Sequence, residues 1–321
     1  MNKKIFVTYP IPGEGLDVLK SKGYEIVVSE NKPTKQELIS AVKKYDALIS
    51  LLSDLIDKEV IDAANKQLKI IANYAVGFDN IDLKGATSKN IIVTNTPGTS
   101  SEAVAEFTIG LMLNITRKIV EADKFIRAGF YKGWEPELLL GMELREKTLG
   151  IVGLGHIGTR VAKIANRGFD MKILYTDVAP NKEFEKDHCA TFMNLDELLA
   201  QSDIVTLHVP LFPSTHHLID LKQIKKMKKS AFLINTSRGP VVNEKDLAEA
   251  LDNNLIAGAA IDVYEFEPKI TEKLLNLKNI ILTPHVASAT QEARNSMSLV
   301  VAQNVDAVLR GGKAITPVNI I

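Results

Sequence analysis

Short apolar runs rich in β-branched residues alternate with helical patterns along almost the whole chain of 321 residues. Strand patterns such as KIFVTYP and ALISLL are separated by segments whose apolar residues recur with the period of a helix. Thr34 and Glu37, for example, have the spacing of a capping box at the start of one such helix. This alternation predicts right-handed βαβ units around parallel sheets, so the expected fold class is α/β.

The alternation is interrupted after Pro97. A single long helical pattern follows, SSEAVAEFTIGLMLNITRKIVEADKFIRAG, and it is apolar on more than one face. We therefore expect one continuous helix, of which one side packs against another subunit. An irregular stretch with Trp134 and Pro136 comes next, and strand and helix patterns then alternate again.

The two stretches of alternation predict two βα modules, residues 1–99 and residues 100–287. A last amphipathic pattern, TQEARNSMSLVVAQNVDAVLRGG, belongs to neither module and needs an apolar surface to cover. We expect it to pack back on the first module, so that residues 1–99 and 288–321 form one discontinuous domain. The two chain crossings would then act as a hinge, and the cleft between the domains would hold the active site.

Charge and composition narrow the class of protein. The 39 lysines and arginines balance the 39 acidic residues, so nothing draws the chain to nucleic acid or to an anionic membrane. The first apolar run is too short for a signal peptide, and no stretch approaches the length of a membrane span. Cys189 is the only cysteine, which excludes an internal disulfide, and His188 beside it is interpreted as a surface residue next to a small buried thiol. A cytoplasmic enzyme or binding protein is expected.

The strongest local motif is the glycine triplet of LGIVGLGHIG, in which Gly153, Gly155 and Gly158 follow an apolar strand and open a helix. Gly153 permits a tight turn, Gly155 lets the backbone approach a pyrophosphate, and Gly158 allows the helix to pack closely on the strand. Asp177 ends the next predicted strand, 19 residues beyond Gly158, where a carboxylate can accept hydrogen bonds from the adenosine ribose. A structural turn beside a surface aspartate is the alternative, but the combination predicts a Rossmann-type dinucleotide-binding domain.

The residues after Asp177 bear on the choice between NAD(H) and NADP(H). An aspartate at this position repels a 2′-phosphate, and the following VAPNK contains no arginine that could bind one. NAD(H) is therefore favoured, while Lys182 keeps NADP(H) as an alternative. His156, inside the glycine loop, is interpreted as a phosphate-facing or exposed side chain rather than a catalytic one.

Polar residues also stand where three later strands end. Arg238 follows FLINTS, Asp262 and then Glu267 follow AGAAI, and His285 follows IILTP. Because the carboxyl ends of parallel strands meet at one edge of a sheet, we expect these side chains to converge, although they are spread over 47 positions.

Such a group of side chains suits the reduction of a ketone. Protonating the carbonyl oxygen needs an acid, and the ordinary pKa of histidine lies near neutral pH. A carboxylate beside the histidine favours the imidazolium, with Glu267 as the expected partner, and an arginine can bind a substrate carboxylate with its fork of donors. The alternatives are that Arg238 is a turn residue, that Glu267 is simply exposed, and that Asp262 caps a loop.

The other histidines give weaker signals. His208, in the strand pattern TLHVP, is interpreted as structural or as a wall of the cofactor site. His216 and His217 are similar to a metal-binding pair, but no carboxylate or cysteine recurs at ligand spacing, so no metal site is expected.

Taken together, the motifs resemble those of the D-isomer-specific 2-hydroxyacid dehydrogenase family over essentially the whole chain. The segments that carry the resemblance are GIVGLGHIG with Asp177, SDIVTLHVPLFPSTHHLI, MKKSAFLINTSRGPVVNEKDL, AGAAIDVYEFEP and LTPHVASAT. In that family the arginine, glutamate and histidine of the last three segments are catalytic, which implies these roles for Arg238, Glu267 and His285. The resemblance also implies a flavodoxin-like first domain and a homodimer formed through the long helix after NTP.

The resemblance extends the expected binding sites. NYAVGFDNID matches a loop whose backbone amides hold the substrate carboxylate, which implies substrate binding by Val76 and Gly77 together with Arg238 and His285. The implied cofactor contacts lie in the glycine loop and at strand ends: Gly153, Gly155, His156, Ile157, Gly158, Asp177, Pro210, Thr236 and Asp262.

Several segments, among them ANYAVGFDNID and GWEPELLLGMELREKTLGIVGLG, look most like glyoxylate and hydroxypyruvate reductases. The expected reaction is the NAD(P)H-dependent reduction of glyoxylate or hydroxypyruvate to the D-2-hydroxyacid, with His285 as general acid. The alternatives are another D-2-hydroxyacid specificity, such as lactate, a branched 2-hydroxyacid or phosphoglycerate, and a non-catalytic NAD(H)-sensing binding protein. Glu267 argues against formate dehydrogenases, which have glutamine at that position.

Overall fold

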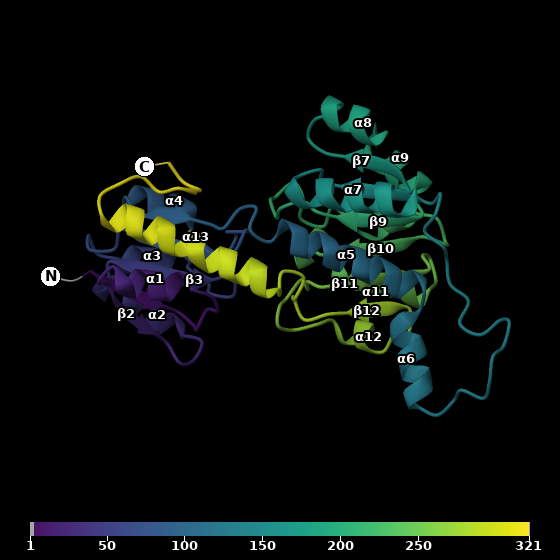
Figure 1. The fold of residues 1–321 in the computed structure, drawn as a ribbon, viewed down its shortest axis with the longest axis horizontal. Helices are drawn as coiled ribbons and strands as arrows, with labels where there is room; N and C mark the ends of the chain where they lie inside the picture. The colour runs from purple at the N-terminus through teal and green to yellow at the C-terminus, as the bar shows by residue number, and fades with distance from the viewer. Residues whose placement is uncertain (1–2, 321) are drawn as a thin grey trace. The chain divides into compact units, whose positions relative to one another are not determined.

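The computed structural model describes residues 3–320, which divide into two compact units. The first unit contains the chain up to Ser100 together with the segment from Ala289 onward, and the second contains Ser101–Ser288 (Figure 1). Each unit is built on one parallel sheet with helices on both faces. This is the α/β class that the alternation of strand and helix patterns predicts, and that prediction is confirmed.

The sheet of the first unit has five parallel strands in the order β2-β1-β3-β4-β5, which is the flavodoxin-like order that the resemblance implies. Thr34 and Glu37 form the predicted capping box, because each side chain accepts a hydrogen bond from the other residue's backbone N–H. The strands are β1 (Lys4–Val7), β2 (Glu25–Val28), β3 (Ala47–Leu51), β4 (Ile70–Tyr74) and β5 (Ile92–Thr94), and the connecting helices are α1 (Gly15–Ser21), α2 (Lys35–Lys44), α3 (Lys58–Ala63) and α4 (Leu83–Ser88).

The last helix, α13 (Gln291–Leu309), completes one face of the first unit. Its apolar residues Met297 and Val301 pack on Ile5 and Val7 of β1, so the ends of the chain share one core. The helix lies against α1 (Figure 1), where a Cβ on Gly15 would come within 2.1 Å of the Ser298 carbonyl oxygen. Only a glycine permits this close approach. On the other face of the sheet, α2, α3 and α4 cover a second core.

The second unit has a seven-stranded parallel sheet in the order β12-β11-β10-β9-β6-β7-β8. Read from the other edge, this is the Rossmann order, and its direction reverses between β6 and β9. Ligands of such sheets bind outside the carboxyl ends of the strands at that switch point. The strands are β6 (Thr148–Val152), β7 (Lys172–Thr176), β8 (Thr191–Phe192), β9 (Ile204–Leu207), β10 (Phe232–Asn235), β11 (Gly258–Ile261) and β12 (Ile280–Leu282).

Two layers of helices bury this sheet. One face is covered by α5 (Ser101–Thr116) and α7 (His156–Phe169), and the other by α9 (Leu195–Gln201), α10 (Leu221–Ile224) and α11 (Glu244–Asp252). The shorter elements are α6 (Ile119–Arg127), α8 (Lys182–His188), the 3₁₀ helix Gly239–Val241 and α12 (Glu272–Leu275). Within residues 3–320, no helix combines the length and apolarity that crossing a membrane requires.

The prediction of one continuous helix after Pro97 is wrong. Lys118 has a left-handed backbone with φ of 54°, and it separates α5 from α6. A later segment provides a hydrogen-bond donor for the end of α5, because the Met142 N–H donates to the Thr116 carbonyl at 2.9 Å. The apolar pattern is continuous across Lys118, so the periodicity of the sequence does not reveal this break.

The interpretation of His188 and Cys189 is also wrong, since the histidine is buried and the cysteine is exposed. His188 lies one turn after Phe184 on α8, and the two rings pack with centroids 4.5 Å apart. Cys189 adopts a left-handed conformation that ends the helix and turns its thiol outward. Burial, together with the positive charges of Arg167 and Lys163, lowers the pKa of His188 and keeps it neutral.

Candidate active site

The glycine loop joins β6 to α7 at the switch point of the second unit's sheet. Gly153 has φ of 95°, a conformation that other residues adopt at a cost. A Cβ on Gly158 would lie 2.1 Å from the Gly153 carbonyl oxygen, whereas a Cβ on Gly155 would meet nothing within 4 Å. Open space above Gly155, at the N-terminus of a 14-residue helix, is the shape that a pyrophosphate requires.

Asp177 lies directly after β7, beside this loop. One carboxylate oxygen accepts a hydrogen bond from the Leu154 N–H at 2.7 Å, and the other accepts from the Val178 N–H at 2.6 Å. The carboxylate is therefore fixed against the loop, where the ribose of a dinucleotide would be bound. His156 is exposed at the first position of α7 and Ile157 is half-buried behind it.

His285 and Glu267 form a hydrogen-bonded pair. The His285 Nδ1–H donates to the Glu267 carboxylate at 2.9 Å, with 31% and 37% of the two side chains exposed. This leaves Nε2 as the ring nitrogen that can face a ligand. His285 has φ of 55°, a left-handed conformation that is uncommon for a residue with a side chain and that often occurs at functional sites.

Electrostatics keep the Glu267 side chain ionised. Burial raises the pKa of this carboxyl, but hydrogen bonds from His285 and from the Tyr264 N–H lower it, as do the positive charges of His285 and Arg238. The lowering effects win, so the pKa lies below its ordinary value. An ionised carboxylate can accept the Nδ1 proton of the histidine and fix the orientation of the ring.

Asp262 holds the segment that carries His285. Its fully buried carboxylate accepts hydrogen bonds from the Thr283 hydroxyl and from the N–H groups of Val286 and Ala287, at 2.7 to 2.9 Å. Asp262 thus caps this loop, which was one of the alternatives open from the sequence. A buried carboxylate with three donors is a strong anchor for the unusual backbone at His285.

Arg238 follows β10 and lies close enough to Glu267 for its charge to lower the pKa of that carboxyl. Gly239 makes this approach possible, because a Cβ there would lie 1.9 Å from the backbone of Tyr264. The Asn235 side chain donates to the Arg238 carbonyl at 2.9 Å and fixes the turn. Arg238, Glu267 and His285 therefore gather at the carboxyl edge of one sheet, within the second unit.

The remaining strand-end residues of the second unit are spread along the same edge. Thr236 is buried and its hydroxyl lies 2.9 Å from that of Thr108, while Pro210 is exposed after β9. His208 follows β9 directly, and its backbone lies against Gly153 of the glycine loop. Burial lowers its pKa to about 3, so its ring is neutral, and neither ring nitrogen bonds to any residue within 3–320. An uncharged side chain here is consistent with the interpretation of His208 as a residue that lines the cofactor site.

Val76 and Gly77 lie in the first unit, after β4. Asn95 donates to the Val76 carbonyl at 2.7 Å and Asn73 donates to the Gly77 carbonyl at 2.9 Å. Among the described residues, the N–H groups of Val76 and Gly77 have no hydrogen-bond acceptor. Two consecutive amides with fixed carbonyls and free N–H groups suit the binding of an anion.

Sequence reasoning missed Tyr264, which connects the loops that carry Glu267 and His285. Its N–H donates to Glu267 at 3.0 Å, and its hydroxyl donates to the Thr283 carbonyl at 2.9 Å. An aromatic residue with a hydroxyl at the end of a buried strand is a signal for such a role, because a buried Tyr hydroxyl needs a partner.

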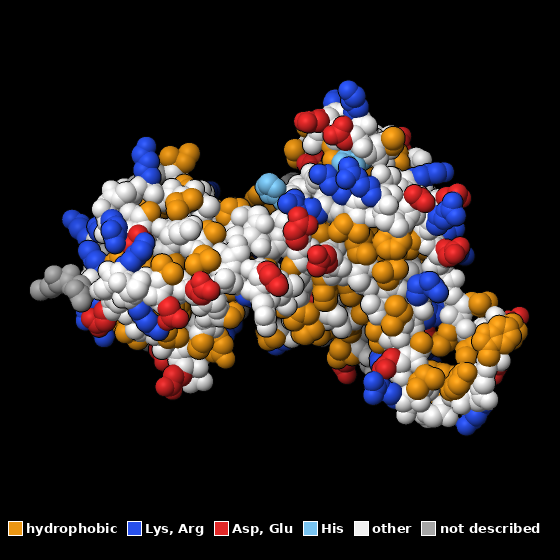
Figure 2. All heavy atoms as spheres, viewed as in Figure 1, with side chains coloured by type: hydrophobic (Ala, Val, Ile, Leu, Met, Phe, Trp, Pro, Cys, Tyr) orange, Lys and Arg blue, Asp and Glu red, His pale blue; other side chains and the backbone are white. Residues whose placement is uncertain are grey.

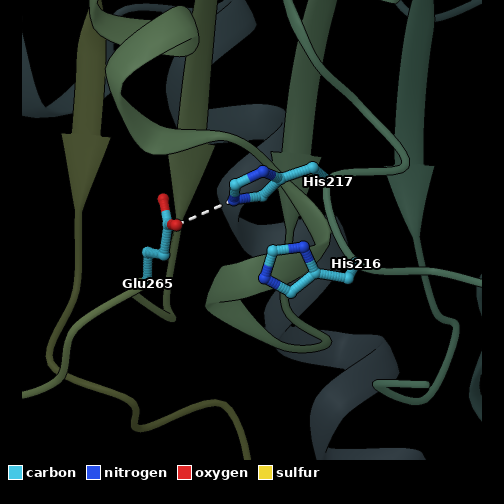
Figure 3. A group of neighbouring side chains, drawn as sticks. All are labelled: His216, His217 and Glu265. Carbon is cyan, nitrogen blue, oxygen red and sulfur yellow. Dashed lines mark hydrogen bonds and ion pairs between the residues drawn. The ribbon is translucent and has the colours of Figure 1, made fainter. Parts of the chain in front are cut away.

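The structure also brings His216 and His217 next to Glu265 (Figure 3). The His217 Nε2–H donates to the Glu265 carboxylate at 2.7 Å. A carboxylate 48 positions away in the chain thus completes a group that the local spacing of residues does not reveal.

The comparisons with known proteins agree with this geometry. The family model described as "D-isomer specific 2-hydroxyacid dehydrogenase, NAD binding domain" matches residues 109–287. A curated protein of Staphylococcus aureus (strain MRSA252), whose provisional name is 2-hydroxyacid dehydrogenase, is 49% identical over 313 residues, which cover 97% of this chain and 98% of that protein.

Two solved structures show the same fold. The structure of a protein from Thermus thermophilus has a TM-score of 0.92 and 41% identity, covering 98% of this chain and 99% of that one. An NADPH-dependent glyoxylate/hydroxypyruvate reductase from Sinorhizobium meliloti, in complex with NADP and malonate, has a TM-score of 0.88 and 32% identity, covering 99% and 97%. The chain belongs to the D-isomer-specific 2-hydroxyacid dehydrogenase family.

Proposed function

We propose that this protein reduces a small 2-oxoacid, glyoxylate or hydroxypyruvate, to the D-2-hydroxyacid, with NADH as the favoured cofactor. The observation that carries the proposal is the hydrogen bond of His285 to Glu267, with Arg238 beside them. All three stand at the carboxyl edge of a Rossmann sheet whose glycine loop has room for a pyrophosphate. An acid, its carboxylate partner and a guanidinium are the groups that ketone reduction needs.

The glycine loop and Asp177 fit a dinucleotide, which, when bound, supplies the hydride for the carbonyl carbon of the substrate. The Gly155 to Gly158 backbone at the N-terminus of α7 binds the pyrophosphate. Asp177 binds the ribose, and Pro210, Thr236 and Asp262 belong to the same proposed binding region at the strand ends.

His285 is the proton donor in the proposed reaction. Its Nδ1–H is committed to Glu267, so Nε2 gives its proton to the carbonyl oxygen as negative charge develops there. The carboxylate opposite Nδ1 stabilises the imidazolium before the transfer and holds the ring in one orientation. In the oxidation direction the same ring accepts the proton from the hydroxyl.

Substrate recognition in the proposal depends on the acid group common to all 2-oxoacids. Arg238 presents a planar fork of donors that matches a carboxylate. In the first unit, the free amides of Val76 and Gly77 are likewise suited to an anion. The similarity to the glyoxylate/hydroxypyruvate reductase of Sinorhizobium meliloti supports a small substrate.

The test of this function is a panel of 2-oxoacids assayed with NADH and with NADPH. Glyoxylate or hydroxypyruvate should give the highest kcat/KM, and chiral analysis should find only the D product from hydroxypyruvate. Higher activity with pyruvate, a branched 2-oxoacid or phosphohydroxypyruvate would replace the substrate assignment. Binding of NADH without turnover of any 2-oxoacid would favour the NAD(H)-sensing alternative.

Replacing Asp177 by asparagine is expected to raise the preference for NADPH over NADH, measured as a ratio of kcat/KM values, by about tenfold or more, equal to about 1.4 kcal/mol. Asparagine keeps an acceptor for the Leu154 N–H but loses the charge that repels a 2′-phosphate. Asp187→Asn, an exposed position on α8, is the matched control. An unchanged ratio in D177N would place the discrimination elsewhere.

We propose further that the protein is a homodimer formed through α5 and α6. No residue of α6 is buried, and apolar side chains gather over α6 and the segment after it (Figure 2). They include Trp134, which is 82% exposed, and Ile126. An exposed apolar patch of this kind marks an interface.

Light scattering after size exclusion should therefore give the mass of a dimer. In the double variant Ile126→Ser, Trp134→Ser, the measured mass is expected to fall to that of the monomer, because the interface loses two apolar contacts. Leu275→Ser, an exposed apolar residue on α12, is the control. A wild-type monomer, or a double variant that stays dimeric, would contradict the proposed interface.

A further inference from the structure

Two imidazoles and a carboxylate converge outside the proposed catalytic group. The ligand atoms of His216, His217 and Glu265 all lie within 4.8 Å of one another. Figure 3 shows the two rings side by side with the carboxylate of Glu265 facing them. The cluster uses none of the groups assigned to the reduction, since Glu267 bonds to His285 and to Tyr264 instead.

The loop between β9 and α10 places the two histidines on the same side. A turn closed by the His216 N–H and the Phe212 carbonyl at 3.0 Å precedes His217. His217 then takes a left-handed conformation with φ of 50°, and its N–H donates to the Pro240 carbonyl at 2.8 Å. The ring centroids of the two residues consequently lie only 4.0 Å apart.

Glu265 is oriented before any ion binds. Its carboxylate accepts from the Glu244 N–H at 3.1 Å, and its own N–H donates to the buried Glu244 carboxylate at 2.8 Å. The Glu265 side chain is 11% exposed, and its other oxygen accepts from His217. Outer partners of this kind fix the direction of a ligand oxygen in metal sites and raise their affinity.

We propose that His216, His217 and Glu265 bind a divalent transition-metal ion of the zinc class. Two imidazoles and one carboxylate are a ligand set that Zn²⁺ accepts with a water in the fourth position. The His216 ring is exposed, and no other residue within 3–320 forms a side-chain hydrogen bond with it, so it is available to the ion from solvent.

Binding requires a small, defined rearrangement. Metal–ligand distances of about 2.0–2.2 Å place two ligands of a tetrahedral ion roughly 3.3 Å apart. His217 and Glu265, now 2.7 Å apart, must separate slightly, and His216 must turn inward from its present place. His217 binds the ion through Nε2 as a neutral imidazole that carries its one N–H on Nδ1, so the ion replaces the hydrogen bond to Glu265.

Isothermal titration of tag-free protein with ZnCl₂ tests the site. One ion per chain is expected, and Co²⁺ should give the visible absorption of a four-coordinate ion. His216→Ala and Glu265→Gln should each raise the dissociation constant at least about tenfold. Since His216 is exposed and unbonded to other side chains, H216A should fold normally, which circular dichroism without metal verifies.

Two matched controls separate this site from chance binding. Cys189→Ser removes the one exposed thiol, and Glu272→Gln removes an exposed carboxyl on α12, so both should bind Zn²⁺ as the wild type does. The proposal is overturned if the wild type binds no stoichiometric ion, if H216A and E265Q keep wild-type affinity, or if C189S abolishes binding.

Discussion

Replacing His285 by alanine is expected to lower kcat by about 10²–10⁴-fold, equal to about 3–5.5 kcal/mol of transition-state stabilisation. The reason is that the proton for the carbonyl oxygen would then have to come from water. The His285 side chain is 31% exposed and belongs to neither apolar core of the second unit, so its loss should leave the fold intact. Steady-state kinetics with glyoxylate and NADH measure the effect.

The dissociation constant for NADH, measured by fluorescence, should stay within about twofold of wild type in this variant. Glu267→Gln is the companion variant, because it keeps the shape of the carboxyl group but loses the charge opposite Nδ1. It should lower kcat less than H285A does. Near wild-type turnover in H285A would remove His285 from the mechanism.

Gly158→Ala should have the second large effect, this time on stability and cofactor binding together. The new Cβ would lie 2.1 Å from the Gly153 carbonyl oxygen, a backbone atom that moves only if the whole loop moves. Overpacking of this kind costs about 1–3 kcal/mol of unfolding free energy. The displaced loop should also weaken NADH binding by at least about tenfold, or about 1.4 kcal/mol.

Two other glycines of the same region provide controls. A Cβ at Gly168, near the end of α7, would meet nothing within 4 Å, so Gly168→Ala should stabilise the protein by up to about 1 kcal/mol. Gly155→Ala also has open space, so it should keep the melting temperature and weaken only NADH binding. Equal melting temperatures for G158A and G155A would contradict the close packing.

The sequence was informative wherever a local pattern decides the structure. Alternating strands and helices predicted both parallel sheets, and the capping box at Thr34 and the turn at Gly153 are formed as expected. The order of polar residues after β10, β11 and β12 also placed His285 and Glu267 at one edge, because parallel strands share their direction.

The sequence did not predict features that depend on contacts between segments far apart in the chain. Lys118 ends the helix within a continuous apolar pattern, and the Met142 N–H bonds to the end of α5. Glu265 reaches His217 across 48 positions, and Asp262 turns its carboxylate to the backbone after β12. The periodicity of the sequence does not predict these contacts, since they depend on how loops pack against one another.

The packing of α13 on β1 has a consequence for the order in which the protein can fold during synthesis. Residues 101–288 are complete as a unit only once Ser288 has left the ribosome, and until α13 follows, the first unit lacks Met297 and Val301 from its core. The segment made first must therefore wait with part of its apolar surface uncovered, which is a state that chaperones recognise. We expect the middle of the chain to reach its native form before the beginning does.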